Sequence, residues 1–379
     1  MFRGVIAVLV MLVVVLVVRN LSGESSASAA GPSASGGSAT SVLEVRQVAT
    51  AQAREASPPR GPFEVRFSQP LAQGSPMPTL DPPVPGSWHR HGKDLSFTPD
   101  YPLVPLSTFQ MTVPGGSGGA GEVESDTGAM LAKSVTLTWT VQNGSVLRIQ
   151  QLLAEWGYLP LTFTPSSPLP NVTGARLEAL YQPPAGTFSW RYSYTPSAVR
   201  SAWKEGVASH MTRGAIVAFE RTHEIPAYTS IRPVLWPALI AAENVDTKNP
   251  EGYTAAIASK VQPETLTIWH DGRIVFHSLA NTGIAQSPTP DGNFFVYLRR
   301  TFQIMRGHNP DGVAYADPVH WINYFNGSDA IHGFVRASYG FPQSVGCVEL
   351  PVPEAAIAWN ILHYGTLVVV TSGPAPRGA

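Results

Sequence analysis

Short runs of alternating apolar and polar residues dominate the chain between residues 62 and 142. The segment 63–67 alternates with a period of two, and further apolar runs cover residues 95–97, 109–113 and 135–141, with Pro- and Gly-containing turns between them. A period of two indicates a half-buried strand, and short strands spaced by turn signals are typical of sandwiches. We therefore expect a small β-sandwich over residues 62–142.

The pattern changes to a helical period in residues 145–227. Apolar residues within 146–153 recur at the spacing of one helix face, and residues 215–219 indicate a second helix that ends before Pro226. A proline-rich insert, residues 160–196, separates the two. We expect a small helical module here.

Strand patterns return in residues 255–371. Two alternating runs flank Asp271-Gly272, which is the strongest short-range hairpin signal because both residues tolerate the positive φ angles of a type I′ turn. One helix is expected over residues 354–364 and a final strand over 366–371. The sequence thus predicts a multidomain, mainly β chain with a mostly β C-terminal domain.

The N-terminus carries fifteen apolar residues, 4–18, between two arginines. This run is short for a membrane span but fits a signal peptide, so we expect residues 1–29 to be either a signal peptide or a membrane anchor. Either one makes the rest of the chain an exported protein. Residues 30–61 are rich in Ser, Ala, Gly and Pro and are expected to be a flexible linker with some helix within 42–56. Residues 372–379 form a tail.

The composition excludes several kinds of partner. The 379-residue chain has a formal net charge of −1, which argues against a nucleic-acid surface because phosphate binding needs a basic field. A single cysteine excludes intrachain disulfides and Cys-rich zinc sites. We expect no metal site, because His89 and His91 lack an evident third ligand. We also expect no other cofactor.

The lone cysteine, Cys347, is the main candidate for chemistry. A thiolate attacks acyl carbons well, and an imidazole such as that of His332, fourteen residues earlier, can take the thiol proton and later return it. Gly346 leaves room for substrate beside the thiol, and the carbonyl of Gly333 could orient the imidazole. The alternative is a buried cysteine that packs as a small hydrophobe.

Three segments resemble known families. Ile331-His332-Gly333 with Ser344-Val345-Gly346-Cys347-Val348, together with Asn281-Thr282-Gly283, residues 289–294 and residues 365–369, resembles the L,D-transpeptidase (YkuD) family over residues 255–371. Residues 62–142 resemble bacterial immunoglobulin-like domains through Trp88 and the run 95–99. Residues 145–227 resemble a peptidoglycan-binding module of three helices, with a simple helical spacer as the alternative.

The YkuD resemblance implies the roles of the site residues. Cys347 would be the nucleophile, His332 the general base and acid, and Gly333 the orienting carbonyl. Gly346 and Cys347 would supply the oxyanion donors, with Ser344 in support. The substrates would be peptidoglycan stem peptides, which form a thioester on the enzyme that the amine of a second stem resolves, without metal or organic cofactor.

Two positions depart from the family pattern. Val345 stands where the family usually has a second histidine, and Glu349 stands where it often has Arg or Asn near a substrate carboxylate. The first change predicts slower turnover or a changed acceptor step, with hydrolysis in place of transfer. The second predicts repulsion of that carboxylate or a preference for an amidated stem. Trp321, Tyr324 and Tyr339 are candidate lining residues of a substrate groove, with core packing as the alternative.

Residues 323–327, which follow His320 and Trp321, are expected to form a flap over the site. His320 is expected at the surface or in packing, with substitution for the missing second imidazole as the alternative. The sequence leaves two other functions open. One is a carboxypeptidase or endopeptidase that uses water as the acceptor, and the other is a catalytically impaired wall-binding protein.

Overall fold

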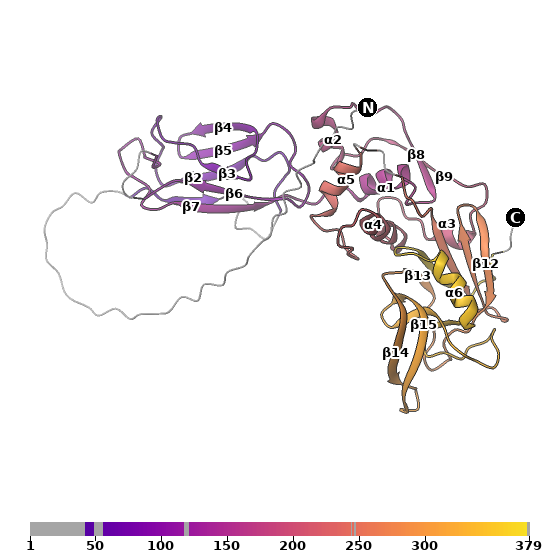
Figure 1. The fold of residues 1–379 in the computed structure, drawn as a ribbon. Coiled ribbons are helices and arrows are strands. Elements are labelled where there is room, and N and C mark those ends of the chain that lie inside the picture. The colour runs from indigo at the N-terminus through magenta and orange to yellow at the C-terminus, as the bar shows by residue number, and fades with distance from the viewer. Residues whose placement is uncertain (1–41, 49–55, 117–120, 244, 246–247, 377–379) are drawn as a thin grey trace, which may run out of the picture. The chain divides into compact units, whose positions relative to one another are not determined.

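The computed structural model describes residues 42–48, 56–116, 121–243, 245 and 248–376, all of which belong to one compact unit, Val42–Ala379. The expected signal peptide or anchor, residues 1–29, lies outside the described residues. Within the described part of the chain, no helix is long and apolar enough to cross a membrane. The fold is mainly β with few helices, as the sequence predicts (Figure 1).

Two sheets pack face to face in the part of the chain between residues 45 and 140. The first sheet has the strand order β1 (Val45–Val48), β2 (Phe63–Phe67), β5 (Asp94–Pro99) and β4 (Gly86–His91), and the second has the order β3 (Thr79–Asp81), β6 (Thr108–Val113) and β7 (Val135–Thr140). Alternate side chains of both sheets fill one core, where Phe63 meets Phe109 and Trp139 edge-on. This is the expected sandwich, and its immunoglobulin-like identity stays a prediction.

Part of the expected linker is folded onto this sandwich. Residues Val45–Val48 form an edge strand that pairs antiparallel with β2, and Leu43 is buried in the core. The expectation of a helix within residues 42–56 is therefore wrong for the part that is described. Tertiary pairing with the sheet edge decides the conformation of this segment rather than its weak local preference.

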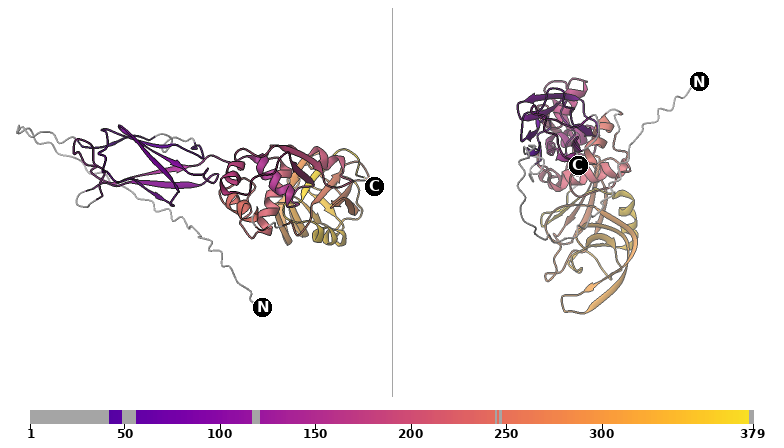
Figure 2. Two further views of the ribbon diagram at one scale, coloured as in Figure 1. Left: turned by 90° about the horizontal axis from the view of Figure 1, so that it is seen from above. Right: turned by 90° about the vertical axis from the view of Figure 1, so that its left-hand side faces the viewer.

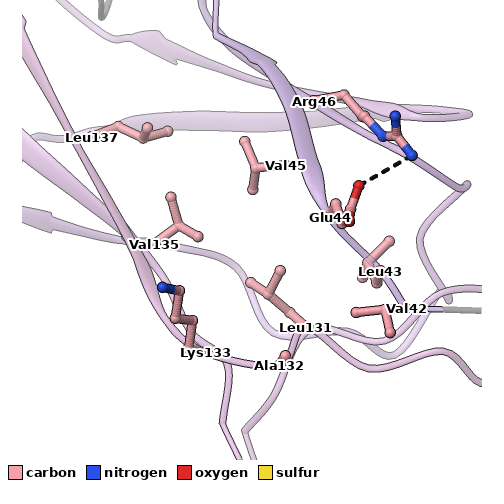
Figure 3. A pocket seen from close by; sticks show the side chains of 10 residues that line it. All are labelled: Val42, Leu43, Glu44, Val45, Arg46, Leu131, Ala132, Lys133, Val135 and Leu137. Atoms are coloured by element: carbon pink, nitrogen blue, oxygen red, sulfur yellow. Dashed lines mark ion pairs between the residues drawn. The ribbon is translucent and has the colours of Figure 1, made fainter. Parts of the chain in front are cut away.

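A groove of about 550 Å³ lies between β1 and the segment leading into β7 (Figure 3). Val45, Leu131 and Val135 line it, and Glu44 forms an ion pair with Arg46 beside it. Its lining residues include neither a cysteine nor a histidine.

The next part of the chain mixes helices with one hairpin. Its elements are α1 (Val146–Glu155), β8 (Leu161–Pro165), α2 (Thr173–Ala179), β9 (Gly186–Trp190), α3 (Ser197–Ser201), α4 (His210–Thr222) and α5 (Leu235–Glu243). The two helices expected from the apolar spacing are present as α1 and α4. The proline-rich insert contains the antiparallel pair β8–β9 and one short helix, α2. The peptidoglycan-binding identity of this part stays a prediction.

One core joins these helices to the C-terminal domain. It combines Ile149 and Phe219 of α1 and α4 with Ile257, Trp269 and Val369 of the neighbouring sheet. That sheet has the order β12 (Arg273–Leu279), β11 (Thr265–His270), β10 (Thr254–Ser259), β18 (Leu367–Thr371) and β13 (Gly292–Phe295). The helices therefore cover one face of the sheet.

The hairpin signal at Asp271-Gly272 is confirmed. The two residues join β11 to β12 with φ angles of 43° and 91°, as a type I′ turn requires. The predicted C-terminal helix is also present, as α6 (Val352–Ile361), although it begins and ends slightly earlier than expected.

A second sheet of the C-terminal domain carries the candidate site. Its order is β14 (Leu298–His308), β15 (Ala314–Asn326), β16 (Asp329–Gly333) and β17 (Val348–Leu350). The long β14–β15 hairpin extends from the domain, as the orange ribbon in the right-hand view of Figure 2 shows. Asn323 and Tyr324 are paired with β14 on one side and with β16 on the other, and Asn326 is paired with β16, so the expectation of a flap there is wrong.

Candidate active site

The parallel pairing of β16 and β17 sets the geometry of the site. His332 lies opposite Glu349, while Ile331 lies opposite Val348. Because side chains alternate across a strand, His332, Glu349 and Cys347, two residues before Glu349, lie on one face of the sheet. Ile331 and Val348 lie on the other face and are buried in the domain core. The core thus fixes the strands that hold the candidate thiol and imidazole.

A cavity of about 360 Å³ contains both groups. Its thirteen lining residues come from the inner face of the β14–β15 hairpin, from the end of β16 and its following loop, and from the segment around the thiol. They are Met305, Asn309, Tyr315, Asp317, Val319, His332, Phe334, Arg336, Gln343, Ser344, Val345, Cys347 and Glu349. The structure therefore brings Cys347 and His332, fourteen residues apart in the sequence, to one cavity.

The thiol of Cys347 is half-buried and protonated at rest. Burial raises its pKa to about 12, with further contributions from the carboxylates of Asp329 and Glu349, while a backbone hydrogen bond from Ala330 acts in the opposite direction. The sulfur lies 3.9 Å from the carbonyl oxygen of Ser328. Among the described residues, no hydrogen bond joins the sulfur to the His332 ring.

The imidazole of His332 is buried and held in one orientation. Its Nδ1 lies 3.3 Å from the carbonyl oxygen of Gly333, which can only accept, so Nδ1 carries the proton. This leaves the lone pair of Nε2 free of a proton. The contact is the one expected between the Gly333 carbonyl and the imidazole, while the roles of both residues in catalysis stay a prediction. Burial lowers the pKa of His332, partly offset by Glu349, so the neutral base persists to lower pH than for an exposed histidine.

The loop before the thiol is held by side-chain hydroxyls. Ser344 Oγ donates to the carbonyl of Cys347 over 2.6 Å and accepts from the N–H of Gly346 over 3.2 Å. Thr289 Oγ1 donates to the carbonyl of Gly346 over 2.8 Å. Because the Gly346 N–H is engaged, of the two expected oxyanion donors only the N–H of Cys347 has no hydrogen bond among the described residues.

Both the backbone conformation at position 346 and the atoms around it require a glycine there. Its φ is +113°, and a Cβ added there would lie 2.6 Å from Oδ1 of Asp329. A larger residue would therefore strain the backbone and push against the carboxylate next to the thiol.

Glu349 is neutralised by a neighbour that the sequence did not single out. Arg336 donates from Nε and Nη2 to both carboxylate oxygens of Glu349, over 2.9 and 2.8 Å, and its plane lies over the Phe334 ring. The expectation that Glu349 presents a free negative charge to the substrate is therefore wrong. A bidentate pair of this kind fixes both side chains.

The three candidate aromatic residues do not line this cavity. Trp321 packs against Trp359, with ring centroids 5.9 Å apart, and Tyr324 is 8% exposed and packs with the apolar residues under the hairpin. The hydroxyl of Tyr339 bridges the Phe334 carbonyl and the Arg336 N–H, and so closes the loop after β16. His320 is exposed and packs beside Phe302, with ring centroids 5.0 Å apart.

Several residues of the site were missed by the sequence analysis. Tyr315 and Asp317 reach the cavity because β15 alternates inward at 315, 317 and 319, but an aspartate among the inward residues conceals this alternation in the hydrophobic pattern of the sequence. Asp329 and Arg336 gave no such signal, since their positions depend on how the loops around β16 close.

Solved structures similar to this chain include several L,D-transpeptidases. One from Mycobacterium smegmatis is 14% identical, with 87% of this chain and 100% of that chain covered and a TM-score of 0.29. L,D-transpeptidase 3 from Mycobacterium tuberculosis is 13% identical, with 86% and 98% covered and a TM-score of 0.29. The catalytic domain of the E. faecium L,D-transpeptidase is 23% identical, with 31% and 96% covered and a TM-score of 0.29.

No curated protein matches this chain. The comparison with family models matches the C-terminal part of the chain, which contains the cavity. Residues 254–370 match the model of the YkuD family, the L,D-transpeptidase catalytic domain.

Proposed function

We propose that this protein is a peptidoglycan L,D-transpeptidase that forms cross-links between stem peptides through a thioester on Cys347. The observation that carries this proposal is the shared cavity of Cys347 and His332, on one sheet face within the segment that matches the L,D-transpeptidase catalytic domain. The imidazole is oriented by Gly333 with its basic nitrogen free, which supports its use as a general base.

The first half-reaction starts from a neutral thiol. The side chain rotates away from Ser328, and Nε2 of His332 takes the proton as the sulfur attacks the carbonyl between the L- and D-centres of a stem peptide. The backbone N–H of Cys347 donates to the resulting oxyanion. His332 then protonates the leaving amine, the C–N bond breaks, and the terminal D-residue leaves with a thioester remaining on the enzyme.

The second half-reaction reverses these roles. The amine of a second stem attacks the thioester, His332 takes a proton from the amine, and the C–N bond forms as the C–S bond breaks. The proton on His332 returns to the sulfur. Val345 offers no imidazole for either step, so His332 alone carries the protons.

The proposed location is the cell envelope. The leader expected in residues 1–29 would export the chain, and the peptidoglycan substrate lies outside the cytoplasm. Whether the leader is a signal peptide or an anchor, residues 254–370 would lie in the same compartment.

The test incubates the purified full chain with tetrapeptide-containing muropeptides and analyses the products by mass spectrometry. Cross-linked dimers would support transfer, whereas tripeptide monomers alone would show that water is the acceptor. Neither product, with a correctly folded chain, would contradict both reactions. The Cys347→Ser variant is the control, and it should yield neither product.

A further inference from the structure

The charges of the residues that line the cavity do not cancel one another. Its charged lining residues among those described are Asp317, Arg336 and Glu349. Arg336 and Glu349 form a bidentate pair, so their charges offset one another. What remains is the carboxylate of Asp317, contributed by β15, together with a protonated thiol and a neutral imidazole.

Asp317 has no partner of its own among the described residues. It lies on β15 opposite Met305 of β14, and no residue in the described ranges forms a hydrogen bond or ion pair with its carboxylate. It is near enough to Arg336 to raise the pKa of that guanidinium, but Arg336 is engaged by Glu349. Asp317 is half-buried, and a cation bound in the cavity would give its carboxylate a partner.

The strand places this carboxylate toward the cavity rather than toward solvent. Tyr315, Asp317 and Val319 line the cavity, whereas the alternate residues Ala316 and Pro318 are exposed. A charged residue is most easily accommodated at the exposed positions, yet the chain has its aspartate among the inward ones. Its position therefore suits recognition of a ligand within the cavity.

We propose that Asp317 is a specificity-determining residue that binds the ammonium group of the acceptor substrate. This inference rests on the proposed function, because the bound ammonium group belongs to the amine that would resolve the thioester. Asp317 would hold the acceptor as an ammonium ion beside the thioester. One proton passes to solvent water, and the neutral amine then attacks while His332 takes a second proton, which it returns to the sulfur.

The test separates acceptor use from acylation. The full chain and its Asp317→Asn variant are first acylated with a tetrapeptide donor, and acylation is followed by intact-protein mass. Deacylation is then measured against two probes: a diamino-acid amide, which is cationic, and hydroxylamine, which is neutral at pH 7. The matched control is Asp311→Asn, which removes the same charge from the hairpin's end while an amide oxygen can still accept from the Val313 N–H.

We expect Asp317→Asn to raise the half-saturating concentration of the cationic acceptor by about tenfold or more, the effect of losing one hydrogen bond to a charged group. Acylation and deacylation by hydroxylamine should stay unchanged, and Asp311→Asn should behave as the parent does. An unchanged response of Asp317→Asn to the cationic acceptor would overturn the inference while leaving the proposed function intact. Failure of the parent chain to acylate would instead overturn the proposed function, and the inference with it.

Discussion

The reactivity of Cys347 reports directly on its pKa, because it is the only cysteine in the chain. A raised pKa predicts that the native thiol reacts more slowly than the same thiol in the unfolded chain. A thiolate pre-formed by His332 predicts the opposite. The perturbation is therefore unfolding itself, and the comparison is made within one molecule.

The magnitude follows from the structure. Raising the pKa from its ordinary value of 9.0 to about 12 lowers the thiolate fraction at pH 8 by about a thousandfold. A more basic thiolate is also more nucleophilic, which with a Brønsted slope of about 0.4–0.5 restores roughly 16- to 32-fold. The native thiol should therefore react roughly 30- to 60-fold more slowly than the unfolded one at pH 8.

The assay follows reaction with a small neutral disulfide between pH 7 and pH 10, in buffer and in urea. Restricted access alone would also slow the native reaction, but its rate would level off near the ordinary thiol pKa. With a raised pKa the native rate keeps increasing by about tenfold for each pH unit up to pH 10. The Asp329→Asn variant, which removes a neighbouring carboxylate, should speed the native reaction and leave the unfolded one unchanged.

A native rate at pH 8 above that of the unfolded chain would refute this reasoning. It would mean that an ion pair of thiolate and imidazolium exists before substrate binds. The proposed first step, in which the proton moves during attack, would then have to be replaced.

The other predictions concern the loop, the charge pair and the departure from the family pattern. Gly346→Ala should lower the free energy of unfolding by about 2–4 kcal/mol, from backbone strain and overpacking against Asp329, and urea denaturation measures this loss. Arg336→Met should cost about 3 kcal/mol because it leaves Glu349 buried without its cation, and Arg336→Met with Glu349→Gln should recover most of that loss. Equal losses in the single and double variants would contradict the pairing. Val345→His should raise the rate of transfer in the muropeptide assay, because position 345 faces the cavity, and an unchanged rate would show that a second imidazole is not needed.

Local patterns predicted those parts of the fold that depend on near neighbours. The Asp271-Gly272 turn, α1 and α4 follow from residues within a few positions of one another. The edge strand β1 could not be predicted in this way, because its conformation depends on pairing with β2. The long strands β14 and β15 were also missed, since three arginines and one glycine in β14, and an aspartate and a proline in β15, interrupt their apolar alternation.

The features of the candidate site also divide into those that nearby residues predict and those that depend on the folded chain. The motif around His332 and Cys347 was visible because its residues are close in sequence, and the pairing of β16 with β17 brings them to one cavity. The neutralisation of Glu349 was not visible, because Arg336 reaches it through the closure of a loop. The engagement of the Gly346 N–H by Ser344 Oγ also required the folded backbone.

The mass of the intact protein after incubation with a tetrapeptide donor tests the thioester itself. The account predicts that the parent chain gains the mass of the donor without its terminal D-residue. Cys347→Ser should gain nothing, and His332→Ala should gain the adduct far more slowly. A folded parent chain that stays unmodified, or an adduct that survives in Cys347→Ser, would contradict the account.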